Sequence, residues 1–76
     1  MEYKLKVQLT DTVRKFSTKV ARDKAFTATI SGLLDLGILE DNIHLFKIDT
    51  QISTFNGQEE QKIVEKYPPN TVKKGE

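Results

Sequence analysis

The fold of this chain is decided by residues 3–37, YKLKVQLTDTVRKFSTKVARDKAFTATISGLLDLG, in which the spacing of apolar residues changes from two to about 3.6. Apolar and polar side chains alternate over residues 3–10, which is typical of a strand with one buried face. A polar break covers 10–12, and the alternation resumes over 15–20. Because a few residues can join antiparallel neighbours, the two segments predict a β-hairpin.

The second half of this stretch has helical spacing. Phe26, Ile30 and Leu33 fall close to one line along a helix over residues 21–36. Gly37 follows at a position that favours the left-handed conformation in which helices often end. We therefore expect the main helix to run from Ala21 to Leu36 and to pack on the hairpin.

The segment from Ile43 to Phe55 alternates again and predicts a third strand, on which Phe46 and Ile48 face the core. Thirteen residues is long against a usual strand length of about 5 to 6, so the strand is either continuous or broken near its middle. Neither alternative is favoured by the sequence.

Residues 56–67 carry the pattern of a short C-terminal helix. Asn56 and Glu59 have the spacing of a capping box, and Pro68 follows where a helix would stop. Apolar residues at 63, 64 and 67 would share one face of that helix.

Together these segments predict a two-layer α+β domain in the order ββαβα. An antiparallel β-hairpin and a third strand form the sheet, the main helix packs on one face, and the short C-terminal helix follows. We expect a single domain over residues 1–67 and a flexible C-terminal tail over 68–76. The expected core is Leu5, Val7, Phe16, Val20, Phe26, Ile30, Leu33, Phe46 and Ile48.

The composition offers little reactive chemistry. The chain has no cysteine, which excludes disulfides and thiolate zinc sites, and its single histidine, His44, has no nucleophile or carboxylate placed beside it by the sequence. We expect His44 to be a structural residue at the rim of the core. Glu40 and Asp41 lack the ligand spacing of a calcium loop, so they are interpreted as a solvated connection. The prediction is a non-enzymatic protein without catalytic residues, metal or cofactor.

The first residues alternate charge and apolar side chain, where a signal peptide needs an apolar stretch of about 7 to 15 residues. No apolar run approaches the roughly 20 residues that span a bilayer. A cytoplasmic location without a membrane role is therefore expected.

Charge is distributed unevenly along the chain. Residues 1–24 carry seven basic and three acidic groups, whereas 25–66 carry three basic and seven acidic ones. The outward face of the hairpin is a candidate binding surface formed by Lys4, Lys6, Lys15 and Lys19. Cationic surfaces attract phosphates, but Tyr3 and Phe16, the aromatic residues that could stack on bases, are expected in the core. Nucleic-acid binding through this face would therefore be weak and non-specific. The same lysines would also protect the sheet from edge-to-edge aggregation.

The apolar surface of the main helix is broader than one sheet face can cover. Its candidate association surface is Ile30, Leu33 and Leu34. Either the C-terminal helix or another chain would cover the excess. The leading functional hypothesis is a small protein-interaction module whose partner is a larger assembly or a second copy. The alternative is a nucleic-acid-binding accessory protein that uses the basic hairpin face.

Overall fold

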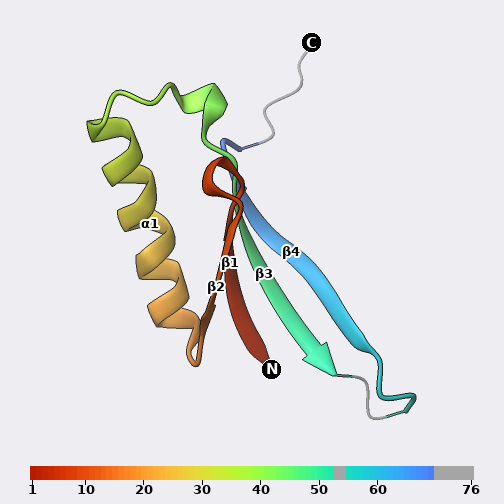
Figure 1. Cartoon of the computed structure of the whole chain (residues 1–76). Helices are drawn as coiled ribbons and strands as arrows, with labels where there is room; N and C mark the ends of the chain where they lie inside the picture. The colour runs from red at the N-terminus through yellow and green to blue at the C-terminus, as the bar shows by residue number, and fades with distance from the viewer. Residues whose placement is uncertain (53–54, 70–76) are drawn as a thin grey trace.

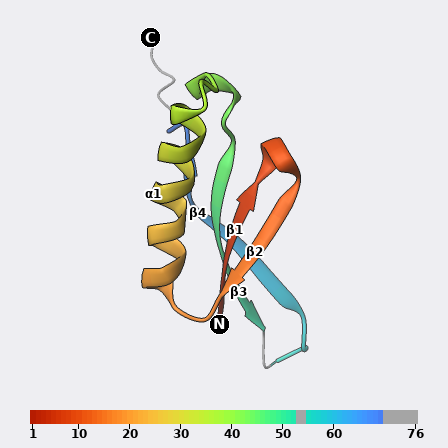
Figure 2. The same cartoon turned by 60° about the vertical axis from the view of Figure 1, so that its left-hand side comes forward.

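A computed structural model describes residues 1–52 and 55–69, which form a four-stranded antiparallel sheet with one α-helix on one of its faces (Figures 1 and 2). The strand order is β2-β1-β3-β4, and 3₁₀ turns η1 and η2 precede β2 and β3. The two-layer α+β class is confirmed. The element bounds are β1 Glu2–Val7, η1 Gln8–Thr10, β2 Thr12–Phe16, α1 Lys19–Asp35, η2 Glu40–Asn42, β3 Leu45–Ile52 and β4 Glu59–Tyr67.

The predicted hairpin is formed by β1 and β2, with Tyr3 opposite Phe16. The second strand lies earlier in the chain than expected, over 12–16 rather than 15–20. It ends at Phe16 because Thr18 caps the helix: its Oγ1 accepts a hydrogen bond from the Ala21 N–H at 3.1 Å. The helix therefore begins at Lys19, and the expected position of Val20 in the core is wrong. Val20 lies on the helix and is 64% exposed.

The core lies between α1 and the sheet. Leu5 and Val7 from β1 pack with Phe26 from the helix, as predicted. Ile43 and Leu45 complete this buried cluster, although neither was among the expected core residues. Other apolar side chains pack around it while remaining partly exposed: Phe16, Ala25, Ile30, Leu33, Ile38 and Tyr67.

The third strand presents the face opposite to the one predicted. Lys47 is paired with Leu5, and its Nζ lies 4.5 Å from the centre of the Phe26 ring, so the odd-numbered residues of β3 point toward the helix. Phe46 and Ile48 therefore lie on the other face of the sheet, so their expected place beneath the helix is wrong. Ile48 is nevertheless buried, as expected of a core residue, whereas Phe46 is only partly buried. The alternation is ambiguous because apolar residues occupy both parities here, at 43 and 45 as well as at 46 and 48.

The predicted C-terminal helix is also wrong, because residues 59–67 form strand β4, which pairs with β3 at every residue except Val64. The turn between them contains Gly57 with φ +72°, and the Asn56 side-chain oxygen accepts a hydrogen bond from the Gln58 N–H at 3.0 Å. Backbone pairing with a neighbouring strand thus overrides the local helix signals. The predicted third strand ends at Ile52 within the described residues, and positions 53–54 lie outside them.

The predicted tail at 68–76 falls outside the described residues from position 70 onward. In the described part of the chain, no helix has the length and apolar character needed to cross a membrane. The only α-helix among the described residues packs on one face of the sheet, which leaves the opposite face as a large surface without a covering element in that part of the chain.

Candidate functional site

The candidate site is the open face, which we define as the sheet surface opposite α1. Among the described residues no helix or second sheet covers it (Figures 1 and 2). The strand register arranges its side chains in rows that run across all four strands. One row, the Phe46 row, is Val13, Lys6, Phe46 and Lys66, and the next, the Lys4 row, is Lys15, Lys4, Ile48 and Ile63.

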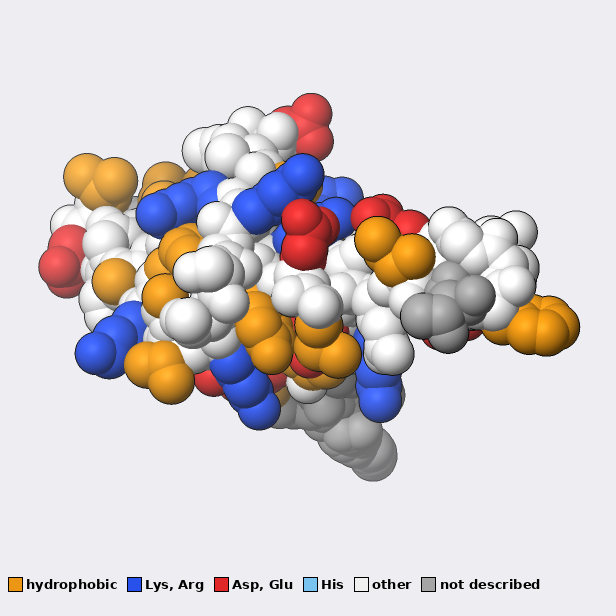
Figure 3. All heavy atoms as spheres, turned by 90° about the horizontal axis from the view of Figure 1, so that it is seen from below, with side chains coloured by type: hydrophobic (Ala, Val, Ile, Leu, Met, Phe, Trp, Pro, Cys, Tyr) orange, Lys and Arg blue, Asp and Glu red, His pale blue; other side chains and the backbone are white. Residues whose placement is uncertain are grey.

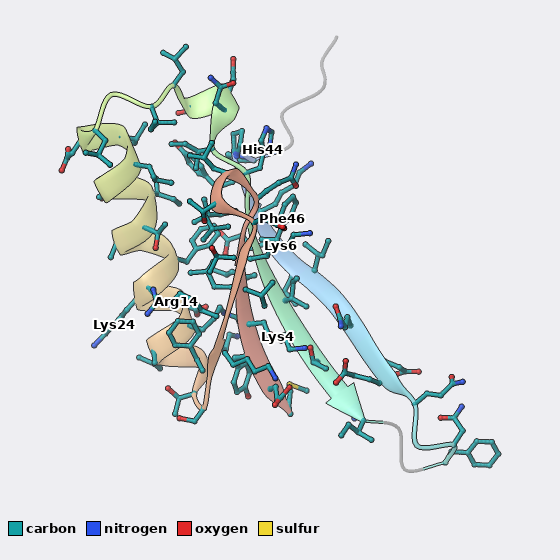
Figure 4. The ribbon with its side chains drawn as sticks, in the orientation of Figure 1. Lys4, Lys6, Arg14, Lys24, His44 and Phe46 are labelled. Atoms are coloured by element: carbon teal, nitrogen blue, oxygen red, sulfur yellow. The ribbon has the colours of Figure 1, made fainter. Side chains whose placement is uncertain are left out.

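The Phe46 row places an aromatic ring between two lysines. Lys6 on β1 and Lys66 on β4 are the cross-strand neighbours of Phe46, each one strand spacing of about 4.8 Å away. The ring is partly buried, and neither lysine forms an ion pair with another described residue. Figure 4 shows Lys6 and Phe46 together on the side of the sheet away from α1. The row therefore combines an apolar ring with two lysines that form no ion pair within the described part of the chain.

A shallow depression of about 350 Å³ lies beside this row. Its apolar part comes from Phe46, Ile48 and Ile63, and amide side chains stand at its border. The six lining residues are Lys6, Gln8, Phe46, Ile48, Gln61 and Ile63, so Lys6 is the one ionisable group among them. An apolar surface with a few polar groups is the usual composition of a ligand site.

Lys4 has a structural role on this face. Its Nζ lies 3.9 Å from carboxylate oxygens of both Glu2 and Glu59, and its side chain is only 11% exposed. The two glutamates offset its charge, and Thr50, directly opposite Glu2 on β3, is also buried. Lys4 is therefore less available to an anionic ligand than the sequence alone suggests.

The structure brings together three of the four lysines of the predicted binding surface. Lys4 and Lys15 are direct neighbours, and Lys6 lies on the same face. Lys19 is not part of this face, because it is the first residue of α1. Arg14 points to the helix side, where its Cζ lies 5.0 Å from the centre of the Phe16 ring (Figure 4). Viewed from below, basic and acidic side chains are interspersed with apolar ones rather than gathered by sign (Figure 3).

The opposite face is held by a buried ionic network. Arg22 on α1 is fully buried, and its Nη1 donates to Asp49 Oδ1 at 2.8 Å and to the Ile48 carbonyl at 3.2 Å. Its Nε donates to Asp23 Oδ1 at 2.8 Å, and Lys47 Nζ lies 3.4 Å from the same oxygen. The hydrogen bond from Arg22, together with the nearby Lys47, holds the pKa of Asp23 below its ordinary value. This network joins α1 to β3, so its charged groups are already paired with one another and stabilise the fold.

The remaining candidates for reactive chemistry are dispersed. His44 is an exposed residue directly before β3, between the buried Ile43 and Leu45. Tyr67 donates a hydrogen bond from its hydroxyl to Glu40 at 2.9 Å, which raises the pKa of Tyr67. No three histidine, aspartate or glutamate side chains of the described residues are grouped as a metal site.

The predicted association surface is only partly available. Ile30 and Leu33 pack against the core, whereas Leu34 is 42% exposed. Two further leucines beyond the helix, Leu36 and Leu39, are more exposed than Leu34. Exposed leucines thus gather near the C-terminal end of α1, and Val20, which is 64% exposed, is a separate exposed apolar residue at its N-terminal end.

Sequence reasoning missed Phe46 and Lys66 as site residues. Phe46 was assigned to the core, although the apolar residues at both parities of 43–48 permit either orientation of the strand. Lys66 reaches the site because residues 59–67 form β4, and the Asn56-Gly57 dipeptide is the hairpin signal that predicts such a strand.

No protein-family model matches the chain, and neither the curated proteins nor the solved structures contain a match to it.

Proposed function

We propose that this chain is a non-enzymatic binding module and that its open face binds nucleic acid weakly and without sequence specificity. The observation that supports this most is the Phe46 row, in which an aromatic ring lies between two lysines without ion-pair partners among the described residues. Proteins that bind nucleic acid without sequence preference combine aromatic platforms for bases with cations for the backbone. The aromatic residue that the sequence interpretation lacked on this surface is Phe46.

The charge of the open face determines how tightly we expect it to bind nucleic acid. Lys6, Lys15 and Lys66 have no ion-pair partner among the described residues, whereas Lys4 is held by two glutamates. If the three lysines each neutralise one phosphate of a single strand, the log-log dependence of affinity on salt has a slope of about −2. A slope this small corresponds to weak binding that near-physiological salt largely suppresses.

The test is a titration with labelled oligonucleotides at two salt concentrations, comparing Lys6→Gln with Lys24→Gln. Both variants remove one positive charge, but Lys24 is an exposed residue of α1 whose side chain points away from the sheet (Figure 4). We expect Lys6→Gln to weaken binding and to make the salt slope less steep by about 0.7, while Lys24→Gln has little effect. Equal losses in the two variants would show that net charge, rather than the open face, controls binding.

A protein-interaction role is the second candidate, and the exposed leucines at the end of α1 favour it. Leu36 and Leu39 are 78% and 69% exposed, and Leu34 lies close to them in sequence. A second copy of the chain that covered these leucines would remove apolar surface from water. Light scattering at two concentrations tests this candidate: a mass that rises with concentration in the wild type and not in Leu36→Asp supports self-association.

Pairing between two copies along β4 is a less suitable form of self-association. The register of β4 shifts between Ile63 and Glu65, so Val64 has no partner on β3 and the strand is bulged there. Five of the nine residues of β4 are charged. Bulges and charged side chains are features by which natural sheets prevent edge-to-edge pairing.

A further inference from the structure

We infer that the depression beside Phe46 is a seat for one unpaired nucleobase, which makes single-stranded nucleic acid the ligand class of the open face. This inference rests on the proposed function and deepens it. The apolar part of the seat is formed by three side chains from neighbouring strands, namely Phe46 and Ile48 on β3 and Ile63 on β4. A base placed on this surface contacts the aromatic ring and two aliphatic side chains.

The size of the seat limits what it can hold. Its volume of about 350 Å³ is at the lower end of the roughly 300 to 1,000 Å³ that ligand pockets occupy. The surface is open on one side, so a base that remains attached to its strand can enter it. One base fits this site, whereas a paired and stacked duplex does not present a free base to it.

Two amide side chains border the seat and supply polar contacts. Gln8 directly follows β1, and its backbone N–H donates to the His44 carbonyl at 2.9 Å, which fixes the backbone at this position. Gln61 lies on β4, and its amide nitrogen donates to Glu59 at 3.3 Å, so its carbonyl oxygen is left as an acceptor. Amide groups both donate and accept hydrogen bonds, which suits the edge of an unpaired base without requiring one particular base.

The flanking lysines place positive charge where the strand enters and leaves. Lys6 lines the seat itself, and Lys66 stands on the other side of Phe46 in the same row. A strand whose base occupies the seat therefore has a cation on each side for its adjacent phosphates. This arrangement separates two contributions, stacking at Phe46 and charge at the lysines, that can be removed independently.

The experiment compares four labelled probes against the full chain at one low salt concentration. They are a single-stranded oligonucleotide, the same strand in a duplex, an abasic strand of equal length, and polyglutamate. We expect binding in the order single strand, then abasic strand and duplex, with no binding of polyglutamate. Phe46→Leu, which keeps the site apolar but removes the ring, should weaken single-strand binding about 5- to 150-fold and leave abasic-strand binding unchanged.

Phe55→Leu is the matched control, because it removes a 96% exposed aromatic ring from the connection between β3 and β4, outside the residues that line the depression. It should leave every affinity unchanged. Gln8→Ala, at an exposed position, tests the seat independently of any effect of Phe46→Leu on folding, and a several-fold loss of single-strand binding alone is expected.

Each other outcome overturns a defined part of the proposal. Suppose that the single and abasic strands bind with equal affinity in the wild type and in both Phe46→Leu and Gln8→Ala. In that case the base seat is wrong, while nucleic-acid binding by charge stands. If no nucleic acid binds at low salt, the proposed function fails together with the seat. Binding of polyglutamate in preference to nucleic acid would identify the open face as a docking surface for an acidic protein.

Discussion

Replacing Asp49 with alanine should lower the free energy of unfolding by about 2 to 3 kcal/mol, because it removes one of two carboxylates from a buried guanidinium. Breaking a fully buried ion pair by deleting one partner costs about 3 to 5 kcal/mol. The loss here is expected below that range, since the Asp49 side chain is 21% exposed and Asp23 remains 2.8 Å from Arg22 Nε. Among the described residues, the buried Nη2 of Arg22 has no hydrogen-bond partner even before the change, so the site has little capacity to compensate.

Urea denaturation followed by circular dichroism measures this effect, with an unchanged m-value confirming that the same surface is exposed on unfolding. A chain of 76 residues is expected to have about 4 to 11 kcal/mol of stability, so the predicted loss is a large fraction. Arg22→Met keeps an apolar stem in the buried site, and combining it with Asp49→Ala should recover about 1 to 2 kcal/mol relative to additivity. A cost under about 0.5 kcal/mol for Asp49→Ala, or strict additivity in the double variant, would show that the network does not hold the helix to the sheet.

Three further predictions concern the packing of the core, the stability of the fold at low pH and the turn between β3 and β4. Phe26→Ala should cost about 3 to 5 kcal/mol in thermal or urea denaturation, because the side chain is 5% exposed within the main cluster, and an unchanged curve would contradict the packing described. Since Arg22 lowers the pKa of Asp23, that carboxylate stabilises the fold above its ordinary pKa of 3.8, and this contribution should disappear as the pH falls through the lowered value. Asp23→Asn should lose less stability between pH 5 and 2 than the wild type does. Parallel curves of unfolding free energy against pH for the two proteins would exclude this role of Asp23. Gly57→Ala should cost about 1 to 2 kcal/mol because φ is +72° there, whereas an increase in stability would mean that the turn adopts another conformation.

The first half of the fold could be predicted because its determinants are local. The hairpin strands are separated by a short turn, and the helix carries its own spacing of apolar residues. The boundary between them was misplaced because Ser17, Thr18 and Lys19 continue the alternation of the strand, while Thr18 also serves as a helix cap. The strand alternation and the helix cap overlap at these residues, and the capping hydrogen bond of Thr18 determines where the helix begins.

The second half could not be predicted, because non-local pairing determines it. Glu59 to Lys62 favour a helix by their individual propensities, but β3 offers a continuous set of backbone partners to the segment that follows the Asn56-Gly57 turn. The β-branched residues Ile63 and Val64 fit a strand better than a helix. A helix over these residues would have left the backbone of β3 unpaired on that side.

The orientation of β3 and the presence of β4 together create the candidate site. With Phe46 in the core, the open face would carry lysines without an aromatic platform, and charge alone would be the basis of binding. Ile43 and Leu45 instead occupy the space beneath the helix, which leaves the Phe46 ring on the opposite surface beside Lys6. β4 then adds Lys66 on the far side of the ring and the apolar side chain that completes the depression. Because a shift of one residue would exchange the two faces of β3, the same shift would remove the base seat. The single-strand preference that we propose for the open face would therefore follow from the register between β1, β3 and β4.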